Sequence, residues 1–415
     1  MANASIIAVG TELLFGQIVN TNAAYISEKL QLLGVNVLYH YTVGDNEGRM
    51  RSTLERALAE SDIVITSGGL GPTQDDLTKE IIAETMGLPL AMDERALAEI
   101  ASFFDRIGRE MTDNNRKQAM LPVGATVFYN ERGTAPGFAA CEGGKTVIAL
   151  PGPPSELAAM FENSVIPFME DRSDAAIYHR TLRFYGIGES QLETDLAPLI
   201  EGQTDPTLAT YAKEGECSLR IASKRRTRDE AAAAVGEMER TVKEIAGKYI
   251  YSDSNEELYE VVAKAMIEKR LTIAAAESCT GGLFASTLIG YTGISEVFDA
   301  GYVTYSNGAK TRELGVPKAL IEQFGAVSEE VAKAMAEGAR KAAGTDIGIA
   351  VTGVAGPDGG TEEKPSGFAW IALADAQGTI TRAHLSRDKG REINRRITVL
   401  AMLALLRRYV AGQNG

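Results

Sequence analysis

The sequence predicts an α/β protein with two separate three-layer α/β domains joined by a small α+β module. Short apolar runs alternate with helical patterns over about the first 170 residues. A polar segment follows at 170–174, and a second alternation of the same kind begins near residue 255. The chain has 415 residues, enough for several domains of about 150 residues each. We place the domains at 1–170, 171–252 and 253–415.

The first domain is expected to hold a parallel sheet covered by helices on both faces. Its short apolar runs predict strands at 5–9, 35–43, 62–66, 126–129 and 146–150. Apolar residues at three- and four-residue spacing predict helices at 20–33, 50–59, 77–86 and 97–107. Glycine and proline follow three of the strands, at the carboxyl ends where such sheets bind ligands.

The later elements divide into a linking module and a second α/β domain. In the module we expect a strand from 178, a helix at 189–200, strands around 208–211 and 217–223, and a helix at 228–248. In the last domain we expect strands at 271–276, 297–305, 347–351, 367–373 and 379–385. Helices are expected at 255–269, 318–323, 329–343 and 391–409.

Composition excludes several classes of protein. A formal net charge of −14 repels phosphate backbones, so direct nucleic-acid binding is not expected. Cys141, Cys217 and Cys279 are far apart, which disfavours a disulfide framework or a zinc site. The first residues resemble a strand rather than a signal peptide, and no apolar run is long enough to span a membrane. We therefore expect a cytoplasmic protein that does not contact a membrane.

A glycine-rich loop at 67–78 predicts a phosphate site in the first domain. Gly68, Gly69 and Gly71 permit close backbone approach, and Asp75 and Asp76 follow at the start of a helix. Two carboxylates near phosphate oxygens favour a divalent cation. The alternative is a tight turn in which one aspartate caps the helix. Glu12 and Asp45 follow two other strands on the same predicted edge, and they favour a phosphorylated ligand.

A serine and a lysine are the candidate catalytic pair of the last domain. Ser278 comes directly after a strand, and Thr280, Gly281 and Gly282 begin a helix whose free amides could hold an oxyanion or a phosphate. None of the three histidines lies near a nucleophile, so the base must be another residue. Lys310 could serve if burial keeps it neutral. Equally, Ser278 could be a helix cap and Lys310 a solvated cation, and Cys279 is either a nucleophile or a small core residue.

Several motifs resemble, in order along the chain, the CinA (competence/damage-inducible protein A) family. In the first domain they are GTELLFG at 10–16, NTN at 20–22, GGLGPTQDDLT at 68–78, GTAPGF at 133–138 and PGPPSE at 151–156. In the last domain they are AESCTGG at 276–282, YSN at 305–307 with Lys310, and VTGVAGP at 351–357. The first domain also resembles the molybdopterin-binding domain of molybdenum cofactor biosynthesis proteins.

For the first domain the resemblance implies metal-assisted hydrolysis of ADP-ribose to AMP and ribose 5-phosphate. Asp75, Asp76, Glu12 and Asp45 are then the candidate ligands of a divalent metal, Mg²⁺ or similar. The diphosphate would be held by Gly68, Gly69, Gly71, Thr73 and Gly152. Binding of a pterin or nucleotide without hydrolysis is the alternative.

For the last domain the resemblance implies deamidation of nicotinamide mononucleotide to nicotinate mononucleotide without a cofactor. Ser278 is then the nucleophile and Lys310 the base, with Tyr305 and Thr352 at matching positions in the motifs. The implied substrate-binding residues are Thr280, Gly281, Gly282, Asn307, Gly353, Arg391 and Arg395. The sequence Asp388-Lys389-Gly390 departs from the Gly-Asp-Arg expected before these arginines, which leaves their alignment open.

Two readings of the function follow. One is a two-activity hydrolase that returns breakdown products of pyridine nucleotides to NAD synthesis, with a homodimer implied by the family. The other is an accessory protein of competence or DNA damage that acts through protein contacts. The linking module resembles a small RNA-binding-like fold, but Gly186-Ile-Gly188 is not the expected GxxG loop, so we interpret the module as a spacer or dimerisation element.

Overall fold

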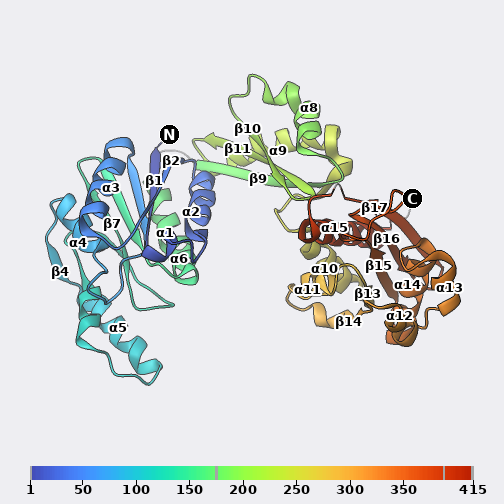
Figure 1. The fold of residues 1–415 in the computed structure, drawn as a ribbon. Coiled ribbons are helices and arrows are strands. Elements are labelled where there is room, and N and C mark those ends of the chain that lie inside the picture. The colour runs from blue at the N-terminus through green and yellow to red at the C-terminus, as the bar shows by residue number, and fades with distance from the viewer. Residues whose placement is uncertain (1, 173–175, 387, 413–415) are drawn as a thin grey trace. The chain divides into compact units, whose positions relative to one another are not determined.

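The computed structural model describes residues 2–172, 176–386 and 388–412, and Figure 1 shows the course of the chain. The chain divides into two compact units. One holds Met1–Tyr178 and Lys224–Ala232, and the other holds His179–Ser223 and Ala233–Gly415. Of the polar linker at 170–174, Ser173 and Asp174 lie outside the described residues.

The N-terminal unit is built on a six-stranded sheet in the order β2-β1-β3-β8-β7-β6. Four neighbouring strands are parallel: β2 (Asn36–Val43), β1 (Asn3–Val9), β3 (Ile63–Ser67) and β8 (Lys145–Leu150). At the other edge β7 (Gly137–Glu142) and β6 (Thr126–Phe128) are antiparallel. The expectation of a parallel sheet is therefore wrong at this edge. Only Gly143 and Gly144 join β7 to β8, and such a short turn can form a hairpin but not a crossover.

Helices cover both faces of this sheet (Figure 1). Neighbouring residues of a strand point to opposite faces, so Ile7 and Ile6 enter two different apolar clusters. The first cluster includes residues of α3 (Glu47–Glu60), α4 (Thr78–Thr85) and α5 (Glu94–Arg106), and the second includes α2 (Thr21–Leu32) and α6 (Pro154–Met160). A separate ribbon pairs β4 (Leu90–Met92) with β5 (Met120–Pro122). The three-layer domain is confirmed.

The linking module is a four-stranded sheet with two long helices. The strands lie in the order β10-β11-β9-β12, where β9 spans Ala176–Tyr185, β10 Thr207–Lys213, β11 Glu216–Arg225 and β12 Ile250–Ser252. The helices are α8 (Glu189–Ile200) and α9 (Arg228–Ala246). This is the α+β module that the sequence predicts.

The C-terminal domain is a second three-layer structure, on a sheet in the order β14-β13-β15-β16-β17. β14 (Phe298–Val303), β13 (Ile273–Glu277) and β15 (Ile347–Gly353) are parallel, and β16 (Phe368–Ala374) and β17 (Thr379–Leu385) are antiparallel. One face packs against α10 (Leu258–Lys269), α11 (Leu283–Leu288) and α15 (Arg391–Val410). The other packs against α12 (Asn307–Leu314), α13 (Lys318–Phe324) and α14 (Glu329–Ala343). Among the helices of the described residues, none has the length and apolarity needed to cross a bilayer.

Candidate functional site

Ser278 lies at the carboxyl end of β13, between two parallel neighbours. Its backbone N–H donates to the Val351 carbonyl at 3.1 Å, so the pairing of β13 with β15 extends to this residue. Only 8% of Ser278 is exposed. Strand pairing thus fixes the backbone of the predicted nucleophile, while its side chain stands just below the surface.

Lys310 reaches Ser278 from the first turn of α12. The Ser306 hydroxyl caps this helix by accepting the Ala309 N–H at 3.1 Å. Lys310 is 1% exposed, and its Nζ lies 3.0 Å from Ser278 Oγ. Nζ also lies 2.8 Å from the Thr304 carbonyl and 3.3 Å from the Tyr305 carbonyl. The structure therefore brings together the two side chains that the sequence singles out.

Burial lowers the pKa of Lys310 below its ordinary value, because a buried ammonium loses its hydration. No salt bridge to Lys310 occurs among the described residues. A neutral amine has two N–H donors and one lone pair. The two carbonyls can accept both N–H groups, which leaves the lone pair for the Ser278 hydroxyl. An ammonium could make the same three contacts with its three N–H donors, so the lowered pKa, and not the contacts alone, favours the neutral amine.

Glu277 shapes the loop that follows the nucleophile, and the sequence analysis missed it. Its carboxylate is 1% exposed and accepts the amides of Gly282 at 3.0 Å, Phe284 at 3.1 Å and Ala285 at 2.9 Å. The Gly281 amide donates to the Ser278 carbonyl at 3.2 Å. The expectation that the amides of Gly281 and Gly282 are free for an oxyanion is therefore wrong, because the loop itself uses both.

The two predicted arginines of α15 reach different loops of the site. The Arg391 guanidinium donates to the Gly356 carbonyl at 2.8 Å and lies 3.3 Å from the Tyr305 hydroxyl. The Arg395 guanidinium donates to the Thr280 carbonyl at 2.6 and 3.2 Å. Tyr305 is 64% exposed. These contacts place Tyr305 and Arg391 at the surface and tie Arg395 to the loop after Ser278.

Three other predicted residues make contacts away from Ser278. The Thr352 hydroxyl is buried and donates to the Ala326 carbonyl at 2.7 Å. A Cβ at Gly353 would lie 2.5 Å from the Phe368 carbonyl, so this glycine permits close packing of β15 on β16. Asn307 is exposed at the start of α12. The structure therefore gives Thr352 and Gly353 contacts within the sheet and its loops, and it leaves Asn307 at the surface.

Cys279 is a buried thiol. Burial raises its pKa to about 11, so the thiolate is scarce at neutral pH. The sequence left open whether this residue is a nucleophile or a small core residue. Its place in the apolar core of the C-terminal domain favours the second reading.

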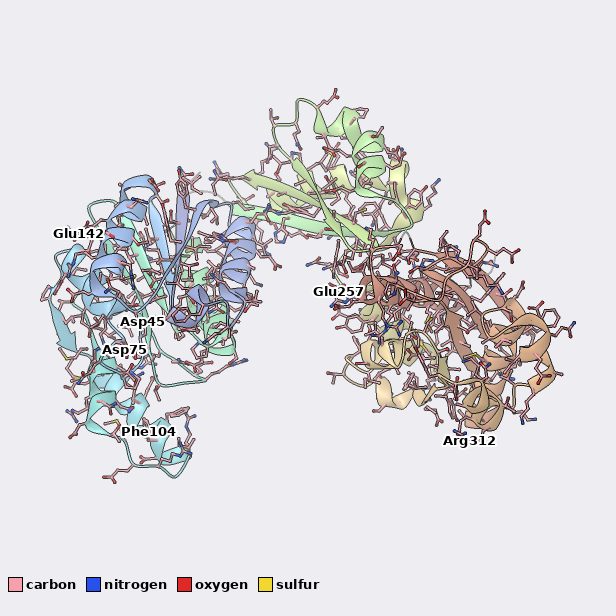
Figure 2. All side chains as sticks on the ribbon, in the orientation of Figure 1. Asp45, Asp75, Phe104, Glu142, Glu257 and Arg312 are labelled. Atoms are coloured by element: carbon pink, nitrogen blue, oxygen red, sulfur yellow. The ribbon has the colours of Figure 1, made fainter. Side chains whose placement is uncertain are left out.

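The N-terminal unit has a cavity of about 380 Å³ beside the carboxyl ends of β1, β3 and β8. Figure 2 labels two of the residues that line it, Asp45 and Asp75. The lining brings together the four predicted metal ligands and four of the predicted phosphate-binding glycines: Glu12, Asp45, Asp75, Asp76, Gly68, Gly69, Gly71 and Gly152. Glu156, which the sequence analysis did not select, adds a fifth carboxylate.

Two glycines of the loop are required by its backbone. Gly68 has φ 103°, and a Cβ there would lie 2.3 Å from the Val9 carbonyl oxygen. Gly69 has φ 70°, and a Cβ there would lie 2.1 Å from the Thr78 hydroxyl. These positive φ angles favour glycine. The loop can therefore present bare backbone to a ligand.

The aspartates of this cavity are held by their own loops. One oxygen of Asp45 accepts the Thr11 amide at 3.0 Å and the Thr11 hydroxyl at 2.7 Å. One oxygen of Asp76 accepts the Thr73 amide at 3.0 Å and also the Thr73 hydroxyl. Thr73, expected to contact a phosphate, instead orients Asp76. The hydroxyl of Thr73 also lowers the pKa of Asp75, so this carboxyl stays ionised.

The carboxylates suit a metal that shares its ligands with a substrate. Within the part of the chain that the structure describes, no group of three His, Cys, Asp or Glu side chains could hold a metal ion. Mg²⁺ is typically bound by one or two carboxylates together with waters and substrate phosphates. The residues present fit such a shared site, and they do not fit a site made by protein ligands alone.

Gln118 is a second residue that the sequence analysis missed. It is 2% exposed and lines the cavity. Its amide nitrogen donates to the Thr134 hydroxyl at 3.1 Å, which leaves its Oε1 buried and without a hydrogen-bond partner. A buried carbonyl without a donor is unfavourable, so this oxygen suits a hydroxyl or amine of a ligand. No pattern in the sequence distinguishes it, because Gln118 lies in a short 3-10 helix (Asp113–Ala119) between α5 and β5.

Three family models match the chain, one for each part. Residues 5–171 match the "Probable molybdopterin binding domain", residues 179–252 the "Damage-inducible protein CinA KH domain", and residues 255–410 the "CinA C-terminal domain".

Relatives match the whole length of the chain. The "Putative competence-damage inducible protein" of Acetivibrio thermocellus is 50% identical and covers 100% of both chains. The "CinA-like protein" of Dictyoglomus turgidum is 46% identical, over 97% of this chain and 98% of its own. A crystal structure of a CinA protein from Thermoplasma acidophilum, whose function is described as unknown, is 40% identical. It covers 40% of this chain and 98% of its own, with a TM-score of 0.38.

Proposed function

The chain belongs to the CinA family, and we propose that its C-terminal domain is an amidase that converts nicotinamide mononucleotide to nicotinate mononucleotide and ammonia. The observation that carries this proposal is the 3.0 Å contact between Ser278 Oγ and a buried Lys310. A neutral amine at that distance can remove the hydroxyl proton as the oxygen attacks a carbonyl carbon. The pyridine-nucleotide substrate rests on the family resemblance.

The proposed reaction has two stages. In the first, Ser278 Oγ forms a bond to the amide carbon and its proton passes to Lys310. Lys310 then gives that proton to the nitrogen, the C–N bond breaks, and ammonia leaves an acyl ester on Ser278. In the second, Lys310 takes a proton from water, the hydroxide oxygen attacks the ester, and the proton returns to Ser278. The products are a carboxylic acid and the unchanged enzyme.

We assign the remaining polar groups to binding and positioning. Arg391, which lies at the surface beside the Tyr305 hydroxyl, is suited to the phosphate of a mononucleotide. Arg395 donates from two of its nitrogens to the Thr280 carbonyl, so this residue holds the loop after the nucleophile. Glu277 holds the other end of the same loop.

Ammonia release from nicotinamide mononucleotide by the full chain tests the proposal. We expect turnover by the native protein and a loss of at least about 10³-fold in Ser278→Ala, because no other nucleophile is poised in the loop. Cys279→Ala is the matched control and should keep most of the activity. Undiminished release from Ser278→Ala would reject the serine mechanism. No release from the native chain would favour an accessory protein of competence or DNA damage.

For the N-terminal domain the cavity favours a second activity, hydrolysis of ADP-ribose to AMP and ribose 5-phosphate. Its glycine loop offers bare backbone to a diphosphate, and its carboxylates suit a divalent metal shared with that diphosphate. Bound there, the metal would neutralise charge on the diphosphate. One or two of the predicted ligands Asp45, Asp75, Asp76 and Glu12 would hold it together with the diphosphate. Gln118 would accept a hydrogen bond from a substrate hydroxyl.

AMP release from ADP-ribose, with and without a chelator, tests this second activity. We expect release that needs a divalent metal and is abolished in Asp76→Ala. Binding of ADP-ribose without turnover would show instead that the domain is a nonhydrolytic nucleotide binder. Release that persists both with chelator and in Asp76→Ala would reject the metal assignment.

A further inference from the structure

A second cavity is in the C-terminal unit and lies between the edge strand β17, the helix α15 and Tyr185 of β9. Its volume is about 160 Å³. None of its lining residues is one that we assign to the amidase site, and neither family resemblance nor the proposed function gives it a role. The lining combines apolar walls with two arginines, a histidine and two tyrosines.

The strand side of the cavity follows from the register of β17. Arg382 pairs with Ile371, and His384 pairs with Ala369. Paired residues of neighbouring strands point to the same face, and Ile371 and Ala369 face the apolar cluster that contains α15. Arg382 and His384 therefore point toward the helix layer, where apolar side chains are expected.

The residues on one face of α15 explain why a cavity forms beside β17. Residues 401, 404, 405 and 408 lie on one face of α15, at spacings of three and four. Two of these are Ala401 and Ala404, which are too small to fill the gap to β17. Leu405 supplies an apolar wall, and Arg408 stands at the rim. Small residues on the helix thus create a cavity where the strand offers polar groups.

Two polar groups of this cavity have protein partners: Arg382 donates to the Thr381 carbonyl at 3.0 Å, and the Tyr409 hydroxyl donates to Asp375 at 2.8 Å. No carboxylate lies within salt-bridge distance of Arg382 or Arg408 among the described residues. His384 Nε2 is buried without a hydrogen-bond partner, and burial lowers the pKa of this imidazole, so it is neutral. Burial also raises the pKa of Tyr185 to about 12, so its hydroxyl keeps its proton. The cavity offers two cations and neutral hydrogen-bonding groups in a protein whose formal net charge is −14.

We propose that this cavity binds a small aromatic carboxylate. The two guanidinium groups match a carboxylate, which accepts charge-assisted hydrogen bonds. Ile371, Ile380 and Leu405 suit an apolar ring, and an apolar cavity of about 150 Å³ is large enough for benzene. A nucleotide is too large, which separates this site from the proposed substrate site. The alternative is that Arg382 only protects an exposed sheet edge from pairing with another chain.

Calorimetry of the full chain with benzoate tests the proposal, and the neutral isostere benzamide and inorganic phosphate are the comparison ligands. We expect saturable binding of benzoate and binding at least about tenfold weaker for benzamide and for phosphate, since each lacks either the charge or the ring. Arg382→Gln and Arg408→Gln should each weaken benzoate binding by about tenfold. Arg312→Gln, the same change at a distant exposed arginine labelled in Figure 2, should leave it unchanged.

A cavity-filling variant tests the need for the cavity's volume separately from the need for its two arginines. Ala401→Leu keeps both arginines and should abolish benzoate binding, while thermal unfolding confirms that the chain is folded. Equal binding of benzoate and benzamide would contradict the proposal, as would benzoate binding that survives Ala401→Leu. No benzoate binding, together with aggregation of Arg382→Gln, would show that Arg382 serves only to protect the edge.

Discussion

The two candidate sites hold their polar groups in different ways. In the C-terminal domain the hydroxyl of Ser278 and the amine of Lys310 contact each other directly, and both are buried. In the N-terminal domain the carboxylates line an open cavity, and Asp45 and Asp76 are oriented by threonines of their own loops. The first arrangement is assembled for chemistry before a substrate binds. In the second arrangement the chemistry depends on the ligand or metal that enters the cavity.

The comparison predicts the largest single effect at Lys310. Lys310→Met removes the proton acceptor and should lower kcat/KM for ammonia release by about 10²- to 10⁴-fold. Lys310→Arg should be as damaging, because a guanidinium does not become neutral. Lys310→Met should not lower the melting temperature below that of the native chain, since this variant no longer buries an ionisable group. Substantial activity in Lys310→Arg would refute the role of a neutral base.

A smaller and selective effect is expected at Asp76. Asp76→Asn keeps the shape of the side chain but removes its charge, and we expect AMP release from ADP-ribose to fall by about 10²-fold. Ammonia release from nicotinamide mononucleotide should be unchanged. Measuring both activities on one preparation checks whether the sites act separately. A parallel loss of both would contradict this separation.

Glu277 is expected to affect the C-terminal site through the shape of its loop. Gln at this position has one carbonyl oxygen in place of two carboxylate oxygens, so it cannot accept all three amides. We expect Glu277→Gln to lower ammonia release by about tenfold and to reduce stability by about 1–3 kcal/mol. The exposed Glu313 provides the control, Glu313→Gln. Native activity in Glu277→Gln would show that these bonds do not position Ser278.

The smallest predicted effect concerns Lys79, the buried lysine of the N-terminal domain. Its Nζ donates to the Lys117 carbonyl at 2.5 Å, and burial lowers its pKa to about 8. Between that value and the ordinary 10.5 the unfolded chain binds more protons, so stability rises with pH. Lys79→Met should reduce this rise by about 2 kcal/mol, measured by unfolding at pH 8 and pH 10. Lys333→Met, at an exposed site, should leave the rise of stability with pH unchanged.

The sequence anticipated the pair at the C-terminal site because each residue follows a strand. Parallel strands end at the same edge of a sheet, so Ser278 after β13 and Lys310 after β14 are brought to one place. The same rule located Glu12, Asp45 and the glycine loop. Positions directly after strands can be recognised in the sequence alone, so these site residues were predictable.

The contacts that support the pair could not be predicted in this way. Glu277 lies at the end of a strand and could equally face solvent, and only the folded loop shows three amides converging on it. Gln118 likewise depends on tertiary packing, since a lone amide has no distinctive pattern. The antiparallel β7 is different, because Gly143-Gly144 between two apolar runs is a local hairpin signal that the sequence prediction did not use. Hydrogen-bond partners of loop residues are fixed by the fold rather than by spacing along the chain.

The central claim is that Lys310 is neutral when it meets Ser278, and titration of its side chain tests this most directly. In the full chain with ¹³C-labelled lysine, the Lys310 resonance can be assigned by its loss in Lys310→Met and followed with pH. We predict a midpoint below 10.5 that coincides with the pH at which kcat/KM for ammonia release rises. A midpoint at the ordinary lysine value would mean that Lys310 is an ammonium at neutral pH, and the Ser278–Lys310 mechanism would then be wrong.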